Sequence, residues 1–198
     1  MRSKFLLALL VVLLSFIASG CAFSVHQTPL NYSYSGPLPK DGIKTPTKSL
    51  TFGEIKDSRD VTTPKMIMNM RNANGYRTSG GWEAEKPIAD IVKDALSEGI
   101  KLSGVGLTPK GDLLLSGEVM DYSGEEKHSK PFYGVFSSKL TVKLQLRDEI
   151  SKKILWRDTF IGQATIDKGN YIKDGFIMAL NDLVTKVVTD EFFLQHFK

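Results

Sequence analysis

The chain has 198 residues, a formal net charge of +4 and a single cysteine. Basic and acidic residues are interspersed, with no block of like charge of the kind that binds polyanions, so we expect no nucleic-acid partner. One cysteine excludes an internal disulfide, and the fold must therefore be stabilised by packing.

The first residues predict a bacterial lipoprotein signal. Arg2 and Lys4 precede an apolar stretch from Phe5 to Ile17, and small residues then lead to Cys21. This pattern resembles a lipobox, with Ala18 at the position where leucine is usual. We expect cleavage before Cys21, acylation of Cys21, and attachment to a membrane through the lipid.

Two alternatives exist for this segment. It could be an ordinary secretory signal followed by a buried or free cysteine, or an uncleaved membrane-spanning helix. The second is disfavoured because the apolar stretch is shorter than the roughly 20 residues that a bilayer core requires. Ala22 stands where a retention signal would place aspartate. We therefore expect the outer membrane, with the protein facing the periplasm.

The remainder is long enough for one compact domain and a tether. Residues 21–48 contain turn signals and little apolar periodicity, and they include Pro29, Pro37, Pro39 and Pro46. This composition predicts an extended lipidated tether, with an edge strand around residues 30–34 as the alternative. Residues 49–198 are then a single domain.

The domain begins with an alternating segment that predicts a strand from Leu50 to Ile55. Met66, Met68 and Met70 fall on one side of a second strand-like alternation. Residues 72–81 are rich in asparagine and glycine, which indicates a mobile or specially shaped loop.

An amphipathic helix follows at residues 87–100, where apolar residues recur at spacings of three and four. Gly99 is placed to end this helix, although Ile100 and Leu102 could extend its apolar face. Three strands are expected next, at residues 112–122, 135–147 and 153–166, joined by short connections. A second apolar helical stripe runs from Phe176 toward Phe192.

This order predicts an α+β fold: an antiparallel sheet with two amphipathic helices packed on one face. The residues expected to share its core are Ile91, Leu96, Leu144, Leu180 and Val184.

The sequence predicts no catalytic residues, no metal site and no cofactor. The histidines, His26, His128 and His196, are far apart and lack metal-ligand spacing. Glu125 and Glu126 are adjacent in an expected turn rather than converging from separate elements, as a hydrolase would require. We therefore expect that the chain is not an enzyme.

The best candidates for partner binding are in and around the glycine-rich loop, because adaptable apolar side chains and turn-rich loops are typical of recognition surfaces. These residues are Asp57, Arg59, Met66, Met68, Met70, Arg71, Asn72 and Tyr76. Core filling is the alternative for the three methionines. Phe132, Tyr133 and Phe136 form a second candidate anchor near a hairpin end, with simple burial as the alternative.

The chain resembles the YajG-like family of bacterial lipoproteins. The resemblance rests on Cys21, the Asp57-Ser58-Arg59 segment, Arg71-Asn72 with Gly75-Tyr76, the helix from Pro87, and the closing Glu191-Phe192-Phe193. It implies an envelope lipoprotein without known enzymatic activity.

Two functional hypotheses follow. The first is a periplasm-facing binding or assembly module that engages an envelope protein or glycan, which includes accessory roles in transport or lipopolysaccharide assembly. The second is an envelope hydrolase whose acids lie in the loops. The lack of a converging acid, nucleophile or metal set favours the first.

Overall fold

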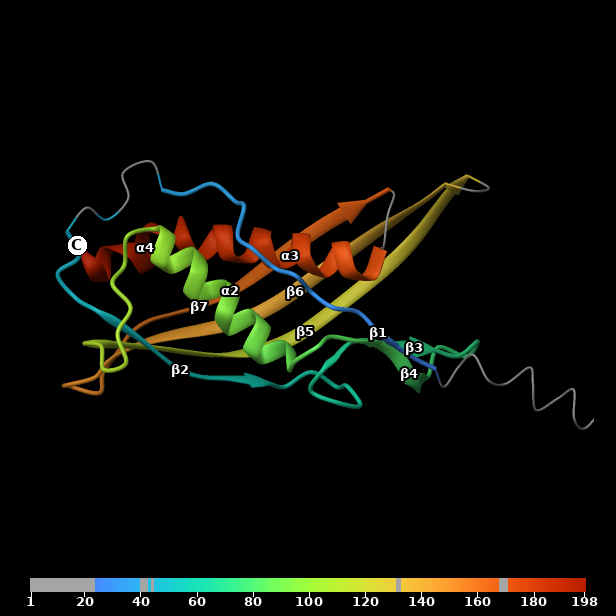
Figure 1. Ribbon diagram of the computed structural model, residues 1–198, viewed down its shortest axis with the longest axis horizontal. Helices are drawn as coiled ribbons and strands as arrows, with labels where there is room; N and C mark the ends of the chain where they lie inside the picture. Colours follow the sequence, from blue (N-terminus) through green and yellow to red (C-terminus); the bar gives the residue numbers. More distant parts are fainter. Residues whose placement is uncertain (1–23, 40–42, 44, 131–132, 168–170) are drawn as a thin grey trace, which may run out of the picture.

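The computed structural model describes residues 24–39, 43, 45–130, 133–167 and 171–198 (Figure 1). The predicted signal segment and Cys21 lie outside the described residues, and so do the side chains of residues 126–134, which include Phe132 and Tyr133.

A four-stranded sheet forms the body of the domain. Its strands are β2 (Leu50–Asp57), β5 (Leu113–Lys130), β6 (Tyr133–Asp148) and β7 (Ile154–Ile166), in the order β2-β5-β6-β7. The three later strands are antiparallel, as short connections require, whereas β2 is parallel to β5. The predicted α+β class is confirmed, with one parallel pair at the edge.

A second, smaller sheet leads away from one end of the body (Figure 1). It contains β1 (Val25–Gln27), β4 (Arg77–Glu83) and β3 (Met66–Arg71), in the order β1-β4-β3. The strands β3 and β4 form a hairpin whose turn lies at residues 72–76. The segment predicted as a loop is therefore a tight turn followed by a strand.

Two long helices, α2 (Ile88–Leu102) and α3 (Tyr171–Val188), cover one face of the large sheet. Short turns follow, α4 (Glu191–Leu194) and the 3-10 helix Gln195–Phe197. The covered face of β6 carries Leu140, Val142 and Leu144, all fully buried, whereas Lys139 and Lys143 of the other face are exposed. The strict alternation of β6 thus decides which face binds the helices.

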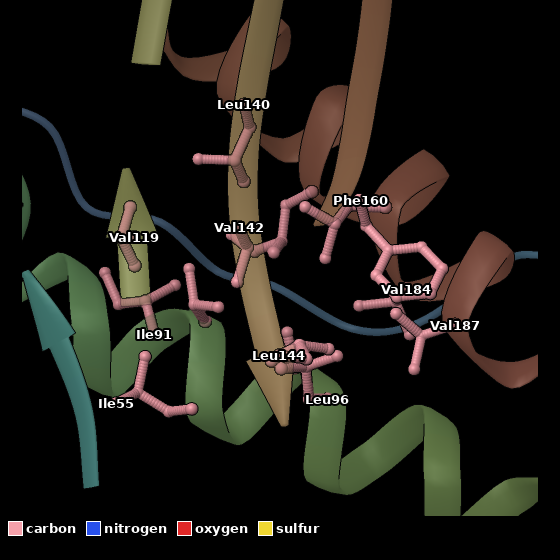
Figure 2. Packing of buried hydrophobic residues seen from close by; sticks show 14 of the residues in the cluster. Ile55, Ile91, Leu96, Val119, Leu140, Val142, Leu144, Phe160, Val184 and Val187 are labelled. Carbon is pink, nitrogen blue, oxygen red and sulfur yellow. The ribbon is translucent and has the colours of Figure 1, made fainter. Parts of the chain in front are cut away.

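The five residues expected in one core are all buried within a single apolar cluster (Figure 2). Among the described residues, no helix is both long and apolar enough to span a bilayer.

Gly99 does not end α2, which continues to Leu102 with Ser103 as its C-cap. The residue is small for a packing reason, because a Cβ at Gly99 would lie 2.3 Å from the Cγ1 of Val184 on α3. The two helices therefore cross closely at this point. Gly104, with φ of +96°, is the residue that turns the chain after the helix.

The extended tether predicted for residues 21–48 does not fit the described residues 24–39 and 43, several of which pair with the small sheet or contribute buried side chains. Val25–Gln27 pairs with β4, and the side chains of Leu30, Tyr34 and Ile43 are buried in the core cluster. The Tyr34 hydroxyl donates a 2.7 Å hydrogen bond to the carbonyl of Pro37. This proline-containing segment packs across the helices. The strand that it forms is Val25–Gln27, which precedes residues 30–34, where the sequence predicts an edge strand as the alternative.

The expectation that alternate methionines share one side of β3 also fails. The β3–β4 register shifts between Met66 and Met68, so Met66 and Ile67 are both fully buried. A comparable shift between Val119 and Asp121 interrupts the β5–β6 register, and β5 continues beyond its predicted end at Tyr122 to Lys130.

Phe136 is buried rather than presented as an anchor. Its ring lies over Gly124 of β5 and against Gly175 of α3, where a Cβ atom would approach the ring to 2.2 Å and 2.8 Å respectively. Those two glycines leave the space that the ring fills.

Candidate binding cleft

A cavity of about 700 Å³ lies between the β3–β4 hairpin and β5. It is open on one side and is bounded at one end by the loop that follows β2. The lining residues are Arg59, Asp60, Val61, Ile67, Met68, Asn69, Met70, Arg71, Arg77, Trp82, Asp121, Tyr122, Ser123 and Gly124. We call this cavity the hairpin cleft.

A buried ion pair fixes the inner end of the hairpin cleft. The Arg59 guanidinium donates from Nε and Nη2 to the two carboxylate oxygens of Asp57, at 2.8 Å and 2.7 Å. Its Nη1 donates to the carbonyl of Ile67 on β3, at 3.1 Å. The Arg59 side chain is only 2% exposed. The bonds from one guanidinium to Asp57 and to Ile67 therefore join the end of β2 to the hairpin.

Two further arginines lie at the outer rim. Arg77 of β4 forms an ion pair with Asp60, whose side chain is 91% exposed. Arg71 of β3 donates to the carbonyl of Gly75 at 2.8 Å, and among the described residues no carboxylate pairs with it. The Arg71 charge is therefore available to a ligand at the rim.

The walls are apolar, with half-buried Met68, Met70 and Trp82 contributed by the hairpin. Trp82 stacks on the His26 ring of β1 with centroids 6.0 Å apart, which orients the indole. Thioethers and an indole give an adaptable apolar surface.

Polar groups also reach the lining. The amide nitrogen of Asn69 donates to the Thr78 carbonyl at 3.1 Å, while its Oδ1 is buried without a hydrogen-bond partner among the described residues. Burial raises the pKa of the Tyr122 phenol far above its usual range, against smaller opposite influences from Ser138 and Arg59. Tyr122 therefore stays protonated at physiological pH.

The structure brings four of the eight predicted partner-binding residues into the hairpin cleft: Arg59, Met68, Met70 and Arg71. Asp57 lies behind them as the carboxylate that holds Arg59. Met66 is fully buried and has no exposed surface for a partner.

Asn72 and Tyr76 lie at the hairpin turn. The Asn72 Oδ1 accepts from the backbone amides of Asn74 and Tyr76, each at 3.0 Å, which identifies Asn72 as a turn-forming residue. The Tyr76 side chain is 70% exposed and does not contribute to the lining.

Sequence patterns do not single out the contributions of β4 and β5, namely Arg77, Trp82 and residues 121–124. Gly80 and Gly81 are typical of turns, so the sequence does not predict the strand β4 that contains them. The alternation of Thr78 and Trp82 with smaller residues is too weak to predict a strand.

Within the described residues, no group of three or more histidine, cysteine or acidic side chains is placed to hold a metal ion.

No family model and no curated protein matches this chain. Among solved structures, it is similar to a crystal structure from Xanthomonas campestris described by the family model DUF330. That match has a TM-score of 0.58 and 14% identity over 83% of this chain and 92% of the other. This match shows a shared fold.

Two more distant structures have TM-scores too low to bear on function. One is the PelC dodecamer from Paraburkholderia phytofirmans, with a TM-score of 0.41 and 14% identity over 83% of this chain and 95% of the other. The second is a minor lipoprotein from Acinetobacter baumannii, with a TM-score of 0.39 and 14% identity over 71% and 89% of the two chains.

Proposed function

We propose that this protein is an outer-membrane lipoprotein that acts as a periplasm-facing binding or assembly module, with the hairpin cleft as its contact site. The observation that carries the proposal is the cleft itself. Adaptable apolar walls and the rim charge of Arg71 are held on a rigid sheet by the buried Asp57–Arg59 pair. Such a mixture of apolar and polar groups is typical of binding sites.

The lipid anchor is supported by the segment that ends at Cys21. Its test is the intact mass of the membrane-extracted protein, which should show a diacyl or triacyl adduct on Cys21. Recovery of a Cys21→Ser variant in the membrane fraction with the same mass adduct would rule out this anchor. Density-gradient separation should place the wild type in the outer membrane.

The binding role is tested by gentle crosslinking of the full-length lipoprotein in cells, followed by co-purification. We expect that replacing Met70 with serine reduces capture of an envelope partner while leaving the melting temperature nearly unchanged, because Met70, unlike Met68, is not packed against the core cluster. Met178→Ser is the matched control, since Met178 is an exposed methionine on α3 outside the hairpin cleft. Equal capture by all three proteins would contradict a role for the cleft.

The proposal includes no catalytic step. Turnover of purified envelope substrates by the wild-type protein, lost when Asp60 or Asp121 of the lining is replaced, would instead favour the hydrolase hypothesis.

A further inference from the structure

Strand β5 is longer than the strand that pairs with one of its edges. β2 pairs with β5 from Leu113 to Val119, and the backbone amide of Ser58 closes that pairing on the Val119 carbonyl at 3.0 Å. Beyond this point β5 continues to Lys130 with β6 on its other side. Among the described residues, no strand pairs with the β2-side edge of this second half.

The hairpin cleft lies along this free edge. Its lining includes Asp121–Gly124 of β5 and, on the other wall, Ile67–Arg71 of β3. β3 is itself the end strand of the small sheet, and the two strands are not hydrogen-bonded to each other. Two strand edges, of β3 and of β5, therefore border one cavity. Figure 1 shows the β3–β4 hairpin and the paired strands β5 and β6 leading away from each other.

An open strand edge presents backbone donors and acceptors at a fixed repeat, and another extended backbone satisfies that repeat best. Proteins usually protect such edges. Here only the wall across the cavity has a side-chain cap, the bond from Arg59 to the Ile67 carbonyl. No comparable side-chain bond to the backbone of residues 121–124 occurs within the described part of the chain.

We propose that the hairpin cleft takes an extended polypeptide segment of another envelope protein, which adds a strand to the free edge of β5. This inference rests on the proposed binding function and specifies its ligand. Residues 121–124 correspond to about 13 Å of strand, so a short segment suffices. Its inward side chains rest on Met68, Met70 and Trp82, and an acidic side chain at one end pairs with Arg71.

The shape of the cavity favours a single strand over a second copy of this chain. Edge-to-edge pairing of two copies would need open space along β5, but the β3–β4 hairpin stands across that space as the opposite wall. A glycan would pack less well against the apolar walls and would pair less well with Arg71. Its hydroxyls also do not match the spacing of the backbone donors and acceptors along a strand edge.

The first experiment places the photo-crosslinker p-benzoyl-phenylalanine at Ser123 of the full-length lipoprotein in cells. The same crosslinker at Thr159, exposed on β7, is the control. We expect Ser123 to give crosslinks that mass spectrometry maps to one short stretch of one envelope protein, absent from the control. The proposal would be overturned if Ser123 gave crosslinks to carbohydrate or to a second copy of this chain, or gave no crosslinks.

The second experiment uses two synthetic peptides with the sequence of the crosslinked stretch, one unmodified and one with N-methyl groups at alternate backbone nitrogens. N-methylation removes the backbone donors and keeps every side chain. Binding to the detergent-solubilised lipoprotein should weaken by about tenfold or more, since each lost hydrogen bond contributes about 1 kcal/mol.

Equal affinity of the two peptides would overturn strand addition and leave the binding function standing. The proposed function itself fails only if gentle crosslinking of the full-length lipoprotein in cells also captures no envelope partner, so the two failures are distinguishable. A peptide whose acidic end is replaced by lysine should bind more weakly to the wild type and regain affinity for the Arg71→Glu variant.

Discussion

Two unpaired edge segments of the large sheet, that of β7 and that of the second half of β5, have different surroundings. At β7, side chains of α3 cap the backbone: the amide of Gln163 donates to Asp182 at 2.8 Å, and Lys186 donates to the carbonyl of Ile161 at 2.7 Å. Asp182 and Lys186 also pair with each other at 2.7 Å. The second half of β5 has a cavity beside it instead.

Side chains of α3 thus protect the backbone of β7 in the way that edge strands usually need, whereas no side chain of the described residues bonds to the backbone of residues 121–124 of β5. The helix that covers β7 comes within close reach at Gly162, where a Cβ would lie 1.9 Å from the carbonyl oxygen of Ala179. The β3–β4 hairpin beside β5 is instead joined to the end of β2 through Arg59. The four predictions below test this contrast.

The largest effect is expected from Asp57→Asn, which leaves the Arg59 guanidinium buried beside a neutral side chain. Removing one partner of a buried ion pair costs about 3 to 5 kcal/mol. Urea unfolding of the purified protein measures this loss. The double variant Asp57→Asn, Arg59→Met should recover part of the stability, and a double variant less stable than Asp57→Asn would show that the pair does not act as a unit.

A smaller loss is expected from Gly162→Ala, because the new methyl group would push α3 away from β7. Overpacking of this kind costs about 1 to 3 kcal/mol. Gly106→Ala is the control, since a Cβ there meets no atom within 4 Å. Similar melting temperatures for the two variants would mean that the helix is not held against the edge.

Asp182→Ala removes one cap of the β7 edge and one partner of Lys186. We expect a stability change of no more than about 1 kcal/mol, because the pair is solvent-exposed. The informative result is self-association, measured by sedimentation velocity, since an uncapped edge becomes available for pairing. Asp94→Ala breaks an exposed pair between Asp94 of α2 and Lys86, which precedes the helix, and this variant should remain as monodisperse as the wild type.

The smallest effect concerns pH at the paired end of β5. Hydrogen bonds from the amide and hydroxyl of Ser49, at 2.8 Å and 2.7 Å, hold the pKa of Asp112 below its usual range. A lowered pKa in the folded state means that the carboxylate stabilises the fold above about pH 4, and that this contribution is lost as the pH falls further.

Asp112→Asn should therefore flatten the fall in stability below about pH 4, as measured by urea unfolding across pH. Asp90→Asn, at an exposed position on α2, is the control. An unchanged slope in the Asp112 variant would contradict the assignment.

The sequence predicts the parts of this fold that depend on local patterns. The stripe that makes α2 and the alternation that makes β6 are repeated within short segments, so their faces follow from spacing alone. The parallel pairing of β2 with β5 depends on a contact between distant segments, for which no local pattern exists.

The candidate site is predicted only on its β3 side for the same reason. Arg59, Met68, Met70 and Arg71 lie near one another in the sequence, whereas Tyr122 and Ser123 reach the cleft through sheet pairing. Register shifts, which place Ile67 and Met66 together in the interior, cannot be deduced from alternation. Tertiary packing also explains why Leu30 and Tyr34 are buried in a segment without periodicity.

The early start of the folded chain has a consequence for where the hairpin cleft would lie relative to the membrane. If Cys21 carries the lipid, the few residues before β1 span at most about 14 Å when fully extended. β1 and β3 flank β4 in the same small sheet, so β3 lies only about 10 Å from β1. The β3 wall of the hairpin cleft would then lie near the membrane surface. A partner segment tethered to the same bilayer would meet it at a raised effective concentration, which compensates for a weak intrinsic affinity.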